Sequence, residues 1–171
     1  MSSEIVPEID AADICERLVG ITPVYLQNFL QRGSYGLRSS VSPGKVRSQR
    51  RLFSPEDVYG IALVWLLFES GLRGEPIARI LKEVAGAKKA SANMAAQALI
   101  ETEGDYLLIA RTPRRPSKSI PDKPEQRVQI CAEEELGTFL EQFSEGVILI
   151  VPFGQKFADV HQRLEILFEV R

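Results

Sequence analysis

Cysteine and histidine are scarce in this chain of 171 residues, which contains only Cys15, Cys131 and His161. A structural zinc site needs four Cys or His ligands, and a disulfide framework needs several cysteine pairs, so the sequence excludes both. Two cysteines far apart in the chain and set among apolar residues are typical of reduced thiols. We therefore expect a cytoplasmic protein with no metal and no cofactor.

Long apolar runs are also absent. The longest, Val147–Val151, is far shorter than the roughly 20 residues that a membrane-spanning helix needs. The first residues, MSSEIVPEIDAAD, are acidic and lack the apolar centre of a secretory signal. We expect neither secretion nor a membrane partner.

Motifs of known catalytic sites are lacking as well. The chain has neither the glycine-rich loop of a nucleotide-binding site nor a nucleophile elbow. His161 stands alone in an amphipathic segment with no evident Asp or Cys partner, so we interpret it as a surface or interface residue. Glu133–Glu135 begin a predicted helix, where acidic side chains are electrostatically favoured. We predict no catalytic residue and no enzymatic activity.

Acidic residues are missing from one long interval, although the formal net charge of the chain is -2. No Asp or Glu stands between Glu16 and Glu56, whereas the part after residue 90 holds 13 acidic and 9 basic residues. A basic stripe on a nearly neutral protein is typical of a surface that contacts nucleic-acid phosphates. The alternative is a solvated loop that contacts nothing. The basic residues of the interval are Arg17, Arg32, Arg38, Lys45, Arg47, Arg50 and Arg51.

The start of this interval predicts two short helices. Asp10 is a good N-cap for a helix over 11–18, which Gly20 ends. Thr22 and Pro23 favour the start of a second helix, which Gly33 ends. Two short helices joined by a tight turn with glycine form the helix-turn-helix pattern.

The next segment predicts a basic β-ribbon followed by two helices. Ser42–Pro43–Gly44–Lys45 is a turn signal, and its flanks are able to pair as strands, which would form a wing beside the second helix. Ser54, Pro55 and Asp57 then form the start of a capped helix that is apolar nearly all round and ends at Gly71. Glu75–Pro76 opens a further helix, with an apolar stripe of Ile77, Ile80, Leu81 and Val84.

The segment RRLFSPEDVYGIALVWLLFESGLRGEPIARILKEV resembles the second half of a MerR-type winged helix-turn-helix domain. The resemblance rests on Arg51 and Phe53 at the end of the wing, on Ser54–Val58, on Gly71–Leu72, and on Ile77, Ile80 and Leu81. Upstream, Ile21–Leu26 and Gly33 resemble the recognition helix of that family. The resemblance covers residues 9–86. The long dimerisation helix typical of the family is missing, because residues 85–104 are too short for sustained heptads.

The second half of the chain predicts a different architecture. Residues 106–109 and 128–130 indicate short strands, residues 147–151 a fully buried strand, and residues 133–143 and 155–168 helices. Between the first two strands, RTPRRPSKSIPDKP predicts an extended loop. The expected fold class is α+β. It comprises a winged helix-turn-helix domain of four helices plus a β-wing over 1–88, a connecting helix or linker over 89–104, and a small α/β domain over 105–171 for dimerisation or signal sensing.

The resemblance implies a transcription regulator of bacterial type that binds double-stranded DNA, and we expect it to act as a homodimer because half-site pairing adds affinity. The C-terminal domain would take a protein partner or a small-molecule effector. The alternative is a protein–protein interaction module on a winged-helix scaffold without sequence-specific DNA binding. The DNA-binding candidates are Tyr25, Gln27, Asn28, Gln31 and Arg32 in the recognition helix, about residues 23–32, and Arg38, Lys45, Arg47, Arg50 and Arg51 in the wing.

Overall fold

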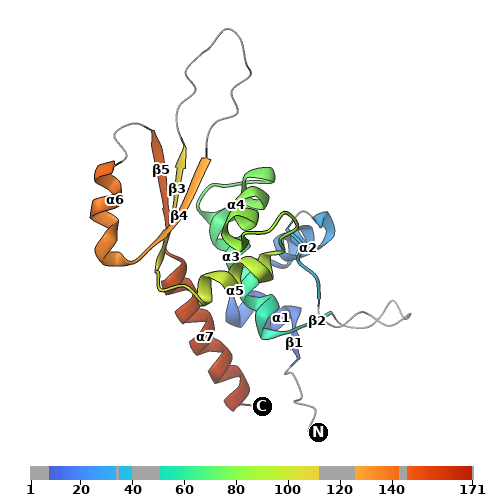
Figure 1. The fold of residues 1–171 in the computed structure, drawn as a ribbon. Helices are drawn as coiled ribbons and strands as arrows, with labels where there is room; N and C mark the ends of the chain where they lie inside the picture. Colours follow the sequence, from blue (N-terminus) through green and yellow to red (C-terminus); the bar gives the residue numbers. More distant parts are fainter. Residues whose placement is uncertain (1–7, 34, 40–50, 112–125, 143–145, 171) are drawn as a thin grey trace, which may run out of the picture.

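The structure, a computed structural model, describes residues 8–33, 35–39, 51–111, 126–142 and 146–170. The fold is α+β, with one helical layer beside a three-stranded sheet and α6 on the sheet's other face (Figure 1). In chain order the elements are β1 (Ile9–Asp10), α1 (Ala11–Asp13), the π-helix η1 (Ile14–Leu18), α2 (Pro23–Arg32), β2 (Leu52–Phe53), α3 (Pro55–Glu69), α4 (Glu75–Ala85), α5 (Ala92–Ile100), β3 (Tyr106–Arg111), β4 (Gln126–Cys131), the 3-10 helix η2 (Glu133–Glu135), α6 (Leu136–Gln142), β5 (Val147–Val151) and α7 (Phe153–Glu169).

The first two predicted helices are present with the predicted bounds. The Asp10 carboxylate accepts a hydrogen bond from the Asp13 backbone N–H at 2.8 Å, as an N-cap does. The first helix is α-helical only to Asp13 and continues as the π-helix η1, in which Val19 N donates to Ile14 O at 2.9 Å. The helix over 23–32 begins with Pro23 and ends at Gly33 in the left-handed conformation.

Strand β1 was not expected from the sequence. It pairs antiparallel with β2, with Ile9 opposite Phe53. The sequence predicted instead that the flanks of the Ser42 turn pair with each other. Residues 35–39 form no strand and β2 pairs with β1, while residues 40–50, which hold the turn itself, lie outside the described residues. The pairing fixes the chain directly after Arg51 against the residues that start α1.

Helix α3 lies at the centre of the helical layer. Its start is a capping box, as predicted: the Asp57 N–H donates to Ser54 Oγ at 3.3 Å, and the Ser54 N–H donates to Asp57 Oδ2 at 3.0 Å. The helix is apolar on nearly all sides because α4, α5 and α7 pack around it. Its buried residues are Asp57, Val58, Gly60, Ile61, Ala62, Leu63, Val64, Trp65 and Leu67.

The C-terminal strands form an antiparallel sheet in the order β4-β3-β5, so the predicted α/β unit has no parallel strands. The prediction that Val147–Val151 is fully buried was wrong. Only Val151 is buried, and the Val147 side chain is 71% exposed. The reason is that β5 is an edge strand, and an uncharged aliphatic run alone does not distinguish an edge from a central strand.

Both halves of the chain contribute to one apolar core. Leu107, Ile109 and Val151 of the sheet belong to the same buried cluster as Ile14 and Ile61 of the N-terminal half. Helix α7 contributes the predicted stripe to this core, with Phe157, Val160, Leu164 and Leu167 buried and Phe168 partly buried. The division into domains stays a prediction. Among the described helices, none has the length and apolar character needed to cross a bilayer.

Candidate nucleic-acid interface

Helix α2 has one buried face and one exposed face. Leu26 and Phe29 belong to the buried core and are 3% and 4% exposed, and the Phe29 ring packs on Trp65 and Phe68 of α3. The opposite face presents Val24, Gln27 and Gln31, spaced i, i+3 and i+7, which puts them in one row along the helix. The row combines uncharged amides with an apolar side chain, and the helix contains no acidic residue. Such a surface is suited to contact with base edges.

One side of this row is bordered by an aromatic cluster and an arginine. The Tyr25 ring, 39% exposed, packs on Phe68 at 4.9 Å and on Trp65 at 5.4 Å between ring centroids. The Arg73 guanidinium lies 3.5 Å from the centroid of the Phe68 ring and donates to the Phe68 and Leu72 carbonyls. Tyr25 is therefore held by its ring, and Arg73 is an exposed cation with a fixed place beside α2.

The other side of the row opens into a groove of about 380 Å³ between the first helix and α2. Arg51 and Gln27 both line this groove, so the structure brings together two residues that are 24 positions apart and that the sequence selected independently. Arg51 is exposed and is placed by β2, which follows it directly. Together with Arg73, it puts one positive charge on each side of the exposed face of α2.

The other residues predicted to bind DNA differ in their exposure and position. Asn28 is half-buried, Arg38 is exposed, and Arg32 is the last residue of α2. Lys45, Arg47 and Arg50 lie outside the described residues. Val24, 66% exposed, and Arg73 were not among the residues predicted to bind DNA. The spacing of Val24 from Gln27 and Gln31 was a signal for the first. For Arg73 the signal was its place between Gly71 and Gly74, where two helices join.

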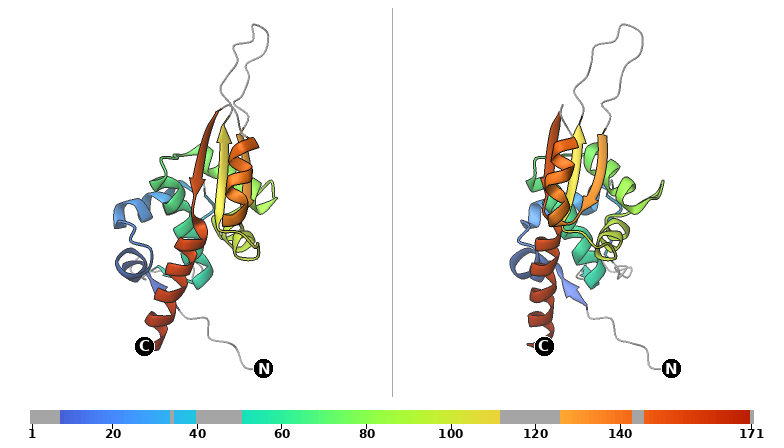
Figure 2. Two further views of the ribbon diagram at one scale, coloured as in Figure 1. Left: turned by 90° about the vertical axis from the view of Figure 1, so that its left-hand side faces the viewer. Right: turned by 60° about the vertical axis from the view of Figure 1, so that its left-hand side comes forward.

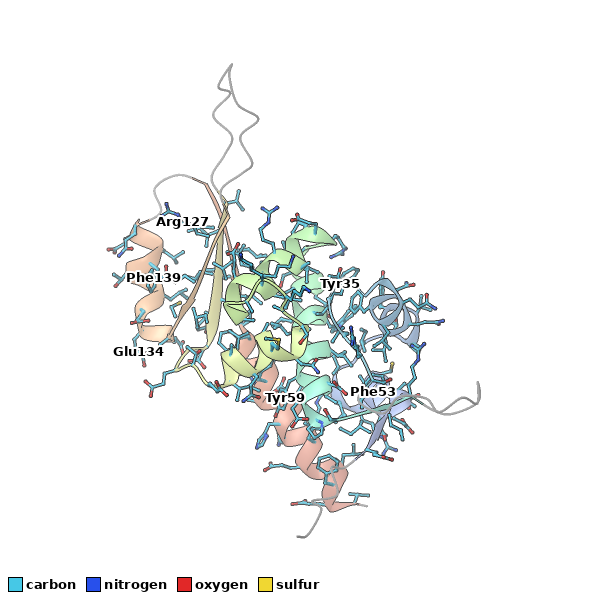
Figure 3. The ribbon with its side chains drawn as sticks, turned by 45° about the vertical axis from the view of Figure 1, so that its right-hand side comes forward. Tyr35, Phe53, Tyr59, Arg127, Glu134 and Phe139 are labelled. Carbon is cyan, nitrogen blue, oxygen red and sulfur yellow. The ribbon has the colours of Figure 1, made fainter. Side chains whose placement is uncertain are left out.

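The start of α5 contacts the residues that follow α2 and fixes their position. The Ala92 N–H donates to the Tyr35 carbonyl at 2.8 Å, and Tyr35 meets Phe29 of α2 edge-on at 5.5 Å between centroids (Figure 3). Gly36 has a positive φ of 64°, and an added Cβ would lie 2.8 Å from Ser91 Cα, so only glycine fits there. The chain therefore leaves α2 in a defined direction.

His161 is exposed, and the structure gives it two partners that the sequence did not indicate. Its Nδ1 lies 3.1 Å from the Tyr59 hydroxyl, and its Nε2 lies 3.4 Å from Glu165 Oε1. Tyr59 and His161 border a shallow hollow of about 300 Å³ beside Phe153 and Phe157. These contacts join α3 to α7.

The Tyr59 hydroxyl gives a test of this contact. Burial and the nearby Glu165 carboxylate raise the pKa of Tyr59 above its usual value of 10.0. Because the folded state holds this proton more tightly, the stabilisation is complete below pH 10 and is lost as the pH rises through the raised pKa. We expect unfolding free energy above pH 10 to fall more steeply for the wild type than for Tyr59→Phe, measured by urea titration. Equal slopes of unfolding free energy against pH in the two proteins would contradict the raised pKa of Tyr59.

Both cysteines are buried and unpaired with each other. Burial, followed by the charge of Glu16, raises the pKa of the Cys15 thiol, and burial with Glu135 does the same for the pKa of Cys131. In the described part of the chain, no three His, Cys, Asp or Glu side chains come together to hold a metal ion.

No protein-family model and no curated protein matches this chain. The resemblance of residues 9–86 to the MerR type therefore rests on the order of its motifs alone.

Proposed function

We propose that the protein is a transcription regulator of the MerR type that binds duplex DNA. In this proposal α2 enters the major groove, and the basic segment from Arg38 to Arg51 holds the phosphate backbone beside it. Recognition helices of the helix-turn-helix class contact base edges mainly through residues in their N-terminal part.

The exposed row of α2 with a placed arginine on each side is the observation that carries this proposal. Gln27 and Gln31 offer amides able to pair bidentately with adenine, each pair giving about 1–3 kcal/mol of discrimination, and Val24 offers an apolar contact to a thymine methyl. In this proposal Arg51, which lines the groove beside α2, and Arg73, which is held on Phe68, would contact flanking phosphates. Phosphate contacts set register without reading sequence.

The test is DNA binding followed by fluorescence anisotropy with mixed-sequence duplexes, titrated from low to physiological salt. Wild-type affinity should fall steeply with salt because bound phosphates release counterions. Arg50→Ala/Arg51→Ala should weaken binding to all sequences alike and lower the salt slope by about one for each arginine that contacts phosphate.

The matched control is Lys82→Ala/Arg127→Ala, which removes the same charge from exposed positions on α4 and β4. Arg127 lies on the sheet, on the other side of the molecule from α2 (Figure 3). The control should bind as the wild type does. Absence of binding by the wild type at low salt would contradict the proposal and favour the interaction module. Equal losses of DNA affinity in both double variants would show that net charge, and not the position of the arginines, determines binding.

Sequence reading has a separate test. An operator is first selected from random duplexes. Gln31→Ala should then weaken the free energy of binding to this operator by about 1–3 kcal/mol and leave the affinity for random duplexes unchanged. An unchanged ratio of operator to random-duplex affinity for both Gln31→Ala and Gln27→Ala would exclude α2 as the reading helix.

A further inference from the structure

Strand β5 forms one border of the C-terminal sheet and is unusually apolar for an edge (Figure 2). Within the described residues it pairs only with β3, and its five residues are all aliphatic. Val147 is 71% exposed and Ile150 37% exposed. Edge strands of stable monomers usually carry charges, proline or a bulge, since an open apolar edge is a template for another strand.

The opposite border differs. Strand β4 carries Arg127 and Gln129, both exposed, on the face of the sheet that α6 covers. A charged, polar edge of this kind discourages strand addition. The two edges of the sheet therefore have opposite character, and only β5 is suited to pairing.

We infer that β5 pairs antiparallel with β5 of a second copy of this chain, around a twofold axis at Leu149. This register places Val147 opposite the partner's Val151 and Ile148 opposite the partner's Ile150. It keeps both sets of side chains on their own faces, because Val151 and Leu149 face the helical layer while Ile148 and Ile150 share the face of Leu108. The most exposed aliphatic side chain of the sheet then gains a cross-strand neighbour.

A second copy fits this edge better than β4 of another molecule. Pairing β5 with β4 is heterologous and leaves a free edge at each end, so it leads to open fibres, whereas pairing β5 with itself closes after two copies. Five residues make a small interface, below the roughly 1,600 Å² of standard protein complexes. We therefore expect a dimer that forms at micromolar concentration and depends strongly on the edge.

The paired strands would form one continuous sheet of six strands. Because a twofold axis perpendicular to the sheet preserves its faces, the two helical layers, and with them both α2 helices, lie on the same side. The inference concerns the sheet and holds whether or not the chain binds DNA. For the proposed regulator, this arrangement would replace the dimerisation helix that the chain lacks.

The first test is the mass of the full chain without DNA, from sedimentation equilibrium between about 1 and 500 µM, a range set by the weak affinity expected for a small interface. The wild type should dimerise, and Val147→Lys should raise the dissociation constant at least tenfold, since a lysine on an edge opposes pairing. Val170→Lys, an equal change at the 80% exposed C-cap of α7, should leave it unchanged. A wild type that stays monomeric throughout would overturn the inference.

A cysteine test fixes the register and does not depend on the folding of Val147→Lys. Leu149→Cys should form a disulfide-linked dimer under mild oxidation, because paired antiparallel residues have Cα atoms about 4.5–5.5 Å apart. Val147→Cys should not, since its two copies would be roughly 13 Å apart along the strands. The wild type, in which both cysteines are buried, is the control without an introduced cysteine. Dimers without a Leu149→Cys crosslink would overturn the inference, because the interface would then lie elsewhere.

Discussion

Asp57→Ala is expected to lower the free energy of unfolding by about 2–4 kcal/mol, from a lost helix cap together with a lost buried hydrogen bond to a charged group. Asp57 is 4% exposed, and two of the hydrogen bonds that its carboxylate accepts have separate functions. One carboxylate oxygen closes the capping box on the Ser54 N–H at 3.0 Å, and the other accepts from Asn93 Nδ2 at 2.6 Å.

The second of these bonds makes the loss large. Asn93 belongs to α5, so Asp57 joins the start of α3 to the start of α5. Among the residues that the structure describes, the buried Asn93 Oδ1 has no hydrogen-bond partner. Asp57→Ala would in addition leave the Nδ2 donor of the same amide without its carboxylate partner. A buried donor without a partner costs about 1–3 kcal/mol.

Urea unfolding followed by the fluorescence of Trp65, the single tryptophan, measures the effect. Ser54→Ala removes only the cap and should cost about 1 kcal/mol. Asp57→Asn keeps an acceptor for Asn93 and should fall between the two. A loss for Asp57→Ala no larger than that for Ser54→Ala would show that the bond to Asn93 contributes nothing.

The sequence predicted one half of this arrangement and not the other. Ser54 and Asp57 are three residues apart, so the capping box is a local pattern and the structure confirmed it. Asn93 lies 36 residues from Asp57, and no local rule links them. Helix α2 illustrates the same limit: its bounds at Pro23 and Gly33 follow from local signals, whereas the contacts of both Tyr25 and Arg73 with Phe68 depend on how α3 packs.

Strand pairing was the weakest part of the sequence analysis, for a related reason. Strands β1 and β2 have two residues each, too few to show a periodicity, and their pairing depends on the whole segment between them. The predicted bounds of β5 are confirmed, but its burial depends on the sheet order β4-β3-β5, which places it at an edge. Exposure of Val147 is thus a property of topology and not of the strand's own residues.

Gly60→Val is expected to lower the free energy of unfolding by about 3 kcal/mol, the upper part of the range for overpacking a core. Gly60 lies in the middle of α3, where valine would ordinarily be the better helix residue by a few tenths of a kcal/mol. At this position valine is instead expected to destabilise the protein, because the first turn of α5 crosses directly over Gly60. A Cβ there would lie 2.9 Å from the Asn93 backbone N and 3.2 Å from the Ala92 carbonyl carbon.

The nearest atom is Oδ1 of the Asn93 side chain, and the next two are backbone atoms of Asn93 and Ala92. Rotating the side chain does not remove the backbone contacts, so the strain has to be relieved by moving α5, and with it the Ala92–Tyr35 hydrogen bond that fixes the chain after α2. Gly137→Val is the matched control, since an added Cβ in α6 meets nothing within 4 Å, and its stability should change by no more than about 0.5 kcal/mol. Urea unfolding of both variants decides between the two effects. If Gly60→Val were as stable as Gly137→Val, the start of α5 would not be seated on α3, and the exit of the chain from α2 would have no fixed support.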